Sequence, residues 1–152
     1  MIRLIFVCHG NICRSPAAEC IARESIKRRG LSQLIEVSSK AVSLEEIGND
    51  IYPPMKRALS KESIPFLPHE AARINQRDYD EADAVYYMDE SNRRILSYLI
   101  RDHKGTLIPF TAYVHSVSEI EDPWYSGRYD LVVRQIKEGV EALLDEWEKK
   151  LR

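Results

Sequence analysis

The chain has 152 residues, a length typical of one domain with its own hydrophobic core. Hydrophobic residues make up 44% of the sequence and charged residues 30%, as in soluble globular proteins. The net charge of −2 does not indicate binding to nucleic acid or to an anionic membrane surface. Because no apolar run is long enough to span a bilayer, we expect a single soluble domain over residues 1–152, without membrane insertion.

All three cysteines, Cys8, Cys13 and Cys20, fall within the first 20 residues. An odd and clustered set of cysteines is a poor disulfide framework and favours a reducing compartment. No histidine cluster accompanies them, so the pattern does not indicate a zinc site. The short apolar start of the chain is also too short for a signal peptide. We therefore expect a cytoplasmic protein.

Apolar runs alternate with amphipathic segments along the chain, which predicts parallel β-α-β units. In chain order we expect a strand over 4–7, a helix over 15–29, a strand over 33–39, a loop over 44–54, a helix over 55–63, a strand over 83–88, a helix over 91–101, a strand over 106–110, a loop over 122–127 and a helix over 129–151. Asp89 or Ser91 is expected to cap the helix over 91–101.

Between the first strand and the first helix lies a short loop of the form C-x5-R, from Cys8 to Arg14. A tight loop at a helix N-terminus directs backbone N–H groups inward, and the helix dipole adds positive potential, so the loop suits an oxyanion. The helix terminus and Arg14 would stabilise the nucleophilic thiolate form of Cys8. The Arg14 guanidinium can bind two phosphoryl oxygens at once. The loop therefore predicts covalent phosphoryl transfer.

The sequence C-H-G-N-I-C-R-S-P, followed much later by D-P-W-Y, resembles the low-molecular-weight protein tyrosine phosphatases. Their pattern is C-x-G-N-x-C-R-S-P near the N-terminus and D-P-[aromatic] near the C-terminus. The two motifs span essentially the whole chain in the expected order. The resemblance implies an α/β domain with a Rossmann-like, four-stranded parallel sheet and helices on both faces. The phosphate-binding loop follows strand one, at the carboxyl edge of the sheet, where sites of such folds lie.

The resemblance also implies catalytic roles. Cys8 is the nucleophile and Arg14 binds the phosphoryl group. Asp122 protonates the leaving phenolate and then activates water as a general base. Trp124 and Tyr125 either stack on an aromatic leaving group or serve only in packing. The full substrate- and phosphate-binding set comprises His9, Gly10, Asn11, Ile12, Cys13, Arg14, Ser15, Trp124 and Tyr125.

The residues expected to support the C-x5-R loop have alternative roles. Ser15 donates a hydrogen bond to the Cys8 thiolate or caps the helix, and the two roles are compatible. Asn11 is expected in a left-handed conformation. The resemblance implies that Ser39 and His69 hold Asn11. The family pattern H-x-A-R carries one more residue here, so a solvated loop histidine is the alternative for His69. Asp89 also matches the family, as a cap or network residue rather than a catalyst.

Three further positions near the C-x5-R loop are open to interpretation. Cys13 is either a small buried hydrophobe or a thiol that condenses with an oxidised Cys8. His9 replaces the Leu or Thr more common in the family, and it adds positive charge only if its side chain points toward the pocket. Glu45 falls where relatives often have an aromatic wall, and an acid there would disfavour strongly acidic peptides.

Three other functions compete with phosphotyrosine hydrolysis. Thioredoxin-linked arsenate reductases of this fold need two mid-chain cysteines, and no cysteine follows Cys20. Protein-arginine phosphatases have Thr where this chain has Ile12, whose apolar side chain suits a tyrosyl ring. A non-catalytic phosphate-binding module would be expected to lack Cys8 or Asp122.

The sequence thus predicts a cysteine-dependent protein-tyrosine phosphatase. Its partners are tyrosine-phosphorylated proteins and, in the site, anions such as phosphate or vanadate. Small aryl phosphates are expected to be substrates in vitro. No metal, other cofactor or nucleic acid is expected, and the protein is expected to be a monomer or weak dimer.

Overall fold

Four parallel strands form one sheet in the computed structural model, which describes all residues from 1 to 152. The strands are β1 (Ile2–Cys8), β2 (Ile35–Ala41), β3 (Ala84–Tyr87) and β4 (Leu107–Pro109), in the order β2-β1-β3-β4. The central strand β1 is buried without interruption from Leu4 to Cys8, as expected for an inner strand covered on both faces. The predicted four-stranded parallel sheet is confirmed.

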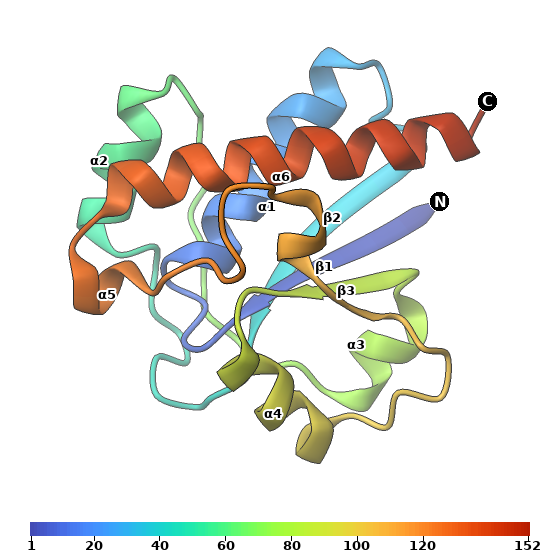
Figure 1. The fold of residues 1–152 in the computed structure, drawn as a ribbon, viewed down its shortest axis with the longest axis horizontal. Helices are drawn as coiled ribbons and strands as arrows, with labels where there is room; N and C mark the ends of the chain where they lie inside the picture. The colour runs from blue at the N-terminus through green and yellow to red at the C-terminus, as the bar shows by residue number, and fades with distance from the viewer.

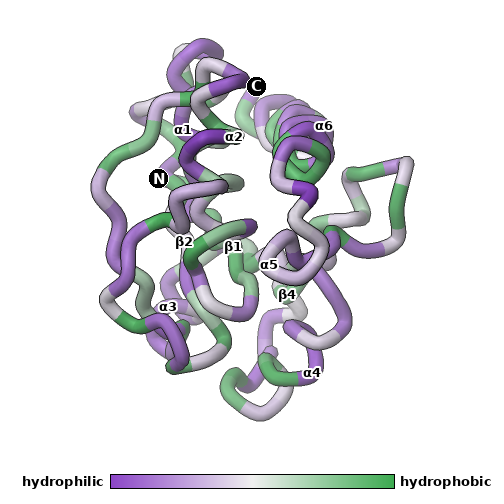
Figure 2. Tube along the Cα trace, turned by 90° about the vertical axis from the view of Figure 1, so that its left-hand side faces the viewer, coloured by the Kyte–Doolittle hydropathy of each residue, from purple (hydrophilic) through white to green (hydrophobic).

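Helices cover both faces of the sheet (Figures 1 and 2). One layer consists of α1 (Arg14–Arg28), α2 (Pro53–Lys61) and α6 (Tyr129–Lys150); the other consists of α3 (Gln76–Glu81) and α4 (Glu90–Leu99). Successive side chains of β1 alternate between the layers. Leu4 and Phe6 belong to the larger core with α1 and α6, whereas Ile5 and Val7 belong to the smaller core with α3 and α4.

The register of the strands determines where a site can form. Cys8 at the end of β1 is aligned with Ala41 of β2, and Val7 is aligned with Tyr87 of β3. The loops that follow these strands therefore emerge at one edge of the sheet. In Figure 1 this is the edge nearer the short helix α5 (Pro123–Ser126).

Several element boundaries differ from the predicted ones. Helix α3 was not predicted; it is six residues long, too short to show a period, and a capping box between Asn75 and Asp78 stabilises its start. Helix α5 and the 3₁₀ helix η1 (Phe110–Tyr113) have only four residues each, and α5 lies inside the predicted loop 122–127. Helix α1 begins at Arg14, so Ser15 lies inside the helix and the N-cap position belongs to Cys13.

The longest helix, α6, has 22 residues and packs across the sheet. Neither α6 nor any other helix has a stretch that is both long enough and apolar enough to cross a membrane.

A close approach between α6 and η1 depends on Gly139. A Cβ atom at this position would overlap the Phe110 ring and come within 2.9 Å of Val114 Cγ2. We expect Gly139→Ala to lower the free energy of unfolding by about 1–3 kcal/mol in urea denaturation, because overpacking outweighs the better helix propensity of alanine. Arg134→Ala, on the exposed side of the same helix, is the matched control. Unchanged stability of the Gly139 variant would contradict this packing.

Candidate active site

The C-x5-R loop, residues 8–14, forms one side of a pocket at the carboxyl edge of the sheet. Strand β1 ends at Cys8 and α1 begins at Arg14, so only residues 9–13 connect the strand to the helix. Asn11 adopts the left-handed conformation expected for it, with φ of 61°. A pocket of about 120 Å³ is lined by Cys8, His9, Gly10, Ile12, Cys13, Arg14, Glu45, Glu46, Asp122, Trp124 and Tyr125. Of these residues, only Glu46 was not considered from the sequence.

The Cys8 thiol is held by groups from the start of α1. Its Sγ lies 3.0 Å from Ser15 Oγ, and the Ser15 backbone N–H donates to the same sulfur at 3.4 Å. Ser15 Oγ accepts a hydrogen bond from Asn11 Nδ2 (2.9 Å), which leaves its own proton for Cys8 or, at 3.4 Å, for the Lys40 carbonyl. The shorter contact is to the sulfur. This arrangement can stabilise a thiolate.

Asn11 is bonded through every polar group of its side chain. Its Nδ2 also donates to Ser39 Oγ (3.0 Å), and its Oδ1 accepts from the Ala72 N–H (3.2 Å). His69 Nε2 donates to the Asn11 carbonyl (2.7 Å), so the partly buried His69 side chain contacts the loop. The structure thus brings Ser39 and His69 to Asn11, as the resemblance implied.

The hydrogen bonds continue to a residue that sequence reasoning missed. Ser39 Oγ donates to Glu19 Oε1 (2.6 Å), and the other Glu19 oxygen pairs with Arg23. Ser15, Glu19 and Arg23 are spaced four residues apart in α1, which puts them on one face of the helix. That spacing was the available signal, and it connects the surface of α1 to the C-x5-R loop.

The Arg14 guanidinium is almost fully buried, with 2% of its side chain exposed. Nη1 donates to Asp89 Oδ2 (2.6 Å) and to the Ile120 carbonyl (2.9 Å). Burial opposes the charge, but the negative charges of Cys8 and Asp89 prevail and hold the pKa of Arg14 above its usual value. Asp89 also caps α4 by accepting from the Asn92 N–H (2.8 Å). It is therefore both the cap and the network residue expected, and Ser91 is not the cap.

Asp122 enters the pocket from the start of α5. Its Oδ1 accepts from the Trp124 N–H (3.0 Å), and its Oδ2 lies 3.5 Å from Arg14 Nη2. The Trp124 ring packs against Tyr52, with ring centroids 4.8 Å apart, and the Tyr52 N–H donates to the Ile12 carbonyl (2.9 Å). The loop around α5 is thus fixed relative to the C-x5-R loop.

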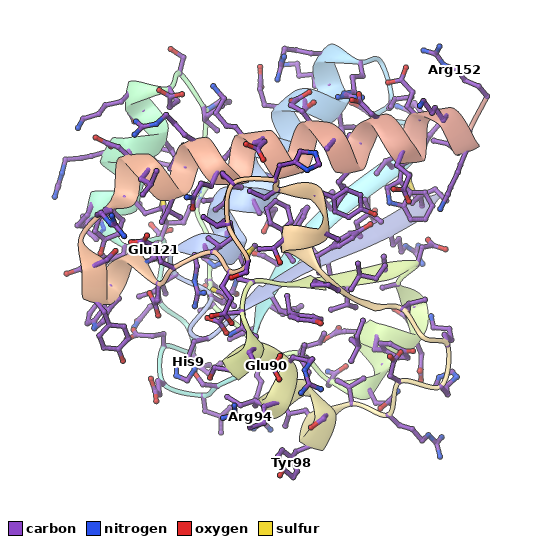
Figure 3. The ribbon with its side chains drawn as sticks, in the orientation of Figure 1. His9, Glu90, Arg94, Tyr98, Glu121 and Arg152 are labelled. Atoms are coloured by element: carbon purple, nitrogen blue, oxygen red, sulfur yellow. The ribbon has the colours of Figure 1, made fainter.

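The other expected residues lie at the rim of the pocket. His9 turns its side chain toward Glu45, and Nε2 donates to Glu45 Oε2 at 3.0 Å. Tyr125 is 85% exposed, so most of its ring is free to contact a ligand. Figure 3 labels His9, which lies below α5 in this view. No group of three or more His, Cys, Asp or Glu side chains is arranged to hold a metal ion.

The two other cysteines differ from Cys8 in their surroundings. Burial raises the pKa of the Cys13 thiol above its ordinary value, and the negative charge of Cys8 raises it further. Burial also raises the pKa of Cys20 to about 11, and the neighbouring Glu19 contributes. Both side chains are therefore neutral thiols near pH 7.

This difference predicts selective alkylation. Iodoacetamide at pH 7 is expected to modify Cys8 in preference to the other two cysteines, because Ser15 can stabilise a Cys8 thiolate whereas burial keeps Cys13 and Cys20 protonated. Peptide mass spectrometry would locate the label, and vanadate should slow the reaction. In urea all three cysteines should react. Rapid modification of Cys13 or Cys20 in the folded protein would contradict this assignment.

A family profile described as "Low molecular weight phosphotyrosine protein phosphatase" matches residues 3–152. The chain belongs to this family. YfkJ of Bacillus subtilis, named a low molecular weight protein-tyrosine-phosphatase, is 32% identical over 148 residues, covering 95% of this chain and 94% of YfkJ. A crystal structure of YfkJ covers 100% of this chain and 98% of its own, with a TM-score of 0.92.

Two further relatives of this phosphatase family differ in the phosphorylated residue that their names indicate. PtpA of Staphylococcus epidermidis, also named a low molecular weight protein-tyrosine-phosphatase, is 30% identical, with 95% of this chain and 93% of PtpA covered. A structure of the arginine phosphatase YwlE, a Bacillus subtilis protein, is 25% identical, with 97% of each chain covered and a TM-score of 0.85. The YwlE molecule in that structure is a cysteine-to-serine mutant with a phosphorylated active-site serine. Relatives with this fold therefore include named tyrosine and arginine phosphatases.

Proposed function

We propose that the protein is a protein-tyrosine phosphatase that hydrolyses phosphotyrosine through a phosphocysteine intermediate. The observation that supports this most strongly is the meeting of Cys8, Arg14 and Asp122 in one pocket. A nucleophile, a buried cation and a carboxylate are the three groups that the reaction needs, and they come from distant parts of the chain.

In the first step, the Cys8 thiolate attacks phosphorus and forms a P–S bond while the P–O bond to the tyrosine breaks. The departing phenolate takes the proton from the Asp122 carboxyl. In the second step, the Asp122 carboxylate takes a proton from water as that water attacks phosphorus. The P–S bond breaks, inorganic phosphate leaves, and the thiolate returns, stabilised by Ser15.

The phosphoryl oxygens carry negative charge throughout the two steps. Arg14 binds two of these oxygens with its planar guanidinium, which Asp89 and the Ile120 carbonyl hold in place. Backbone N–H groups of the C-x5-R loop, residues 8–14, and the N-terminus of α1 face the same anion. Fixed positive groups of this kind stabilise the transition state without needing to reorganise.

Two features favour tyrosine over arginine as the phosphorylated residue. The Ile12 side chain lines the pocket and is apolar, and Trp124 and Tyr125 provide aromatic surface at its entrance. A tyrosyl ring can pack against all three. YfkJ and PtpA are named tyrosine phosphatases and are more similar in sequence to this chain than YwlE is. The phosphorylated serine in the YwlE mutant supports a covalent intermediate on the equivalent residue here.

The test compares matched peptides that carry phosphotyrosine or phosphoarginine, assayed with EDTA present. We expect release of phosphate from the phosphotyrosine peptide, with at least a tenfold higher kcat/KM than for phosphoarginine (~1.4 kcal/mol). A preference for phosphoarginine would assign the arginine phosphatase function instead. Activity on neither peptide would overturn the proposal.

We also propose that the protein acts in the cytoplasm on tyrosine-phosphorylated proteins. Its three cysteines are free thiols, which a reducing compartment preserves. Fractionation of cells followed by detection of the protein tests this location.

A further inference from the structure

The wall loop, residues 43–47, forms part of the pocket that α5 also lines. Glu45 and Glu46 line the pocket itself. Leu44 and Ile47 flank the two acids and are 62% and 47% exposed, although both are apolar. A surface with two carboxylates between two exposed apolar side chains therefore adjoins the entrance.

Main-chain hydrogen bonds join the start of the wall loop, and Val42 before it, to the backbone of Cys8 and His9. The Val42 N–H donates to the Cys8 carbonyl (3.0 Å), and the Ser43 N–H donates to the His9 carbonyl (3.1 Å). The side-chain bond from His9 to Glu45 ties the tip of the wall loop to the same segment. The wall loop is therefore held in a fixed position relative to Cys8.

The charges at the entrance are mostly negative. Arg14 is the only Lys or Arg that lines the pocket, and it is buried at the bottom and paired with Asp89. The Glu45 side chain is 69% exposed, and its only ion-pair partner is His9. The entrance therefore offers carboxylates to a substrate and no exposed arginine or lysine.

A phosphotyrosine that reaches Cys8 leaves its own backbone at the entrance, because the ring fills the pocket. The residues before and after it in the sequence then lie at the rim of the pocket, and the wall loop forms part of that rim. A basic neighbour gains attraction to Glu45 and Glu46, whereas an acidic neighbour is repelled. The aliphatic stems of Lys and Arg can also cover Leu44 and Ile47.

We propose that the wall loop, through Glu45 and Glu46, selects phosphotyrosine sites with basic neighbouring residues. This inference rests on the proposed function and names the substrate class of the same pocket. The partner is the polypeptide segment on either side of the phosphorylated tyrosine.

The experiment measures kcat/KM for two phosphotyrosine peptides that differ only in the adjacent residues, lysine in one and glutamate in the other. Wild type is expected to favour the lysine peptide by about fivefold at low salt, since exposed ion pairs each contribute little. In the double variant Glu45→Gln and Glu46→Gln the ratio should approach one. The matched control is Glu36→Gln, an exposed acid at the opposite end of the sheet, which should keep the wild-type ratio. Raising the ionic strength should also reduce the ratio, because salt screens exposed charges.

A small aryl phosphate separates the two proposals, because p-nitrophenyl phosphate has no neighbouring residues. If it and both peptides remain intact, the proposed function fails. If it is hydrolysed by wild type and by the double variant, both proteins are folded and active. An equal rate for the two peptides in wild type, or an unchanged ratio in the double variant, would then overturn selection by the wall loop.

Discussion

Replacing Cys8 with serine is expected to lower the turnover of phosphotyrosine at least about 10⁴-fold, because a serine hydroxyl is not ionised near neutral pH. No general base stands beside this position to activate a hydroxyl: the contacts of Cys8 Sγ are the hydroxyl and N–H of Ser15. The anion site stays intact, since Arg14 and the loop backbone are unchanged. Binding of phosphate or vanadate, measured by calorimetry, should remain close to that of wild type.

The matched control for this variant is Cys13→Ser. Cys13 lines the same pocket and is also buried, but its thiol is neutral. It should retain most of the activity, because the sulfur of Cys13 takes no part in the proposed steps. Substantial turnover by the Cys8 variant, or equal loss in both variants, would remove Cys8 from the nucleophile role.

Replacing Asp122 with asparagine is expected to produce the second-largest effect, and its size should depend on the leaving group. The amide oxygen can still accept from the Trp124 N–H, so the start of α5 keeps its cap. The amide cannot supply a proton. Turnover of phenyl phosphate, a poor leaving group, should fall about 10²–10⁴-fold, and that of p-nitrophenyl phosphate much less.

The control for the Asp122 variant is Asp130→Asn. Asp130 is an exposed carboxylate in the first turn of α6 that pairs with Lys61. The control variant should leave the dependence on leaving group unchanged. A loss of equal size for all leaving groups in the Asp122 variant would contradict the general-acid assignment.

The sequence predicted the C-x5-R loop because its parts are contiguous. A buried strand, a short loop and a helix N-terminus fix the relation of Cys8 to Arg14 with little help from the rest of the fold. The partners of these residues could not be predicted in the same way. Glu19 reads as an exposed residue of an amphipathic helix, and only the folded β2 brings Ser39 to its carboxylate.

His69 shows a different limit of prediction from the sequence. Its sequence context departs by one residue from the family pattern, which left its position open. In the structure the Ala72 N–H donates to Asn11 Oδ1, and His69 Nε2 donates to the Asn11 carbonyl. Helix α3 escaped prediction because helices of six residues are too short for a periodic pattern. The segment 122–127, predicted as a loop, contains one helical turn, α5, which begins at Pro123 and ends before Gly127.

The pairing of Arg14 has a consequence for how the chain folds. The motif itself is complete within the first 14 residues, yet the guanidinium is held by Asp89 and by the Ile120 carbonyl, and the Ile120 N–H donates to the Met88 carbonyl. An N-terminal fragment that contains the whole motif therefore lacks the groups that orient its cation. Phosphate should bind only after the C-terminal half has docked, so it binds the native state and not the unfolded chain. The melting temperature should therefore rise with the phosphate concentration, and the affinity for the anion becomes a measure of complete folding.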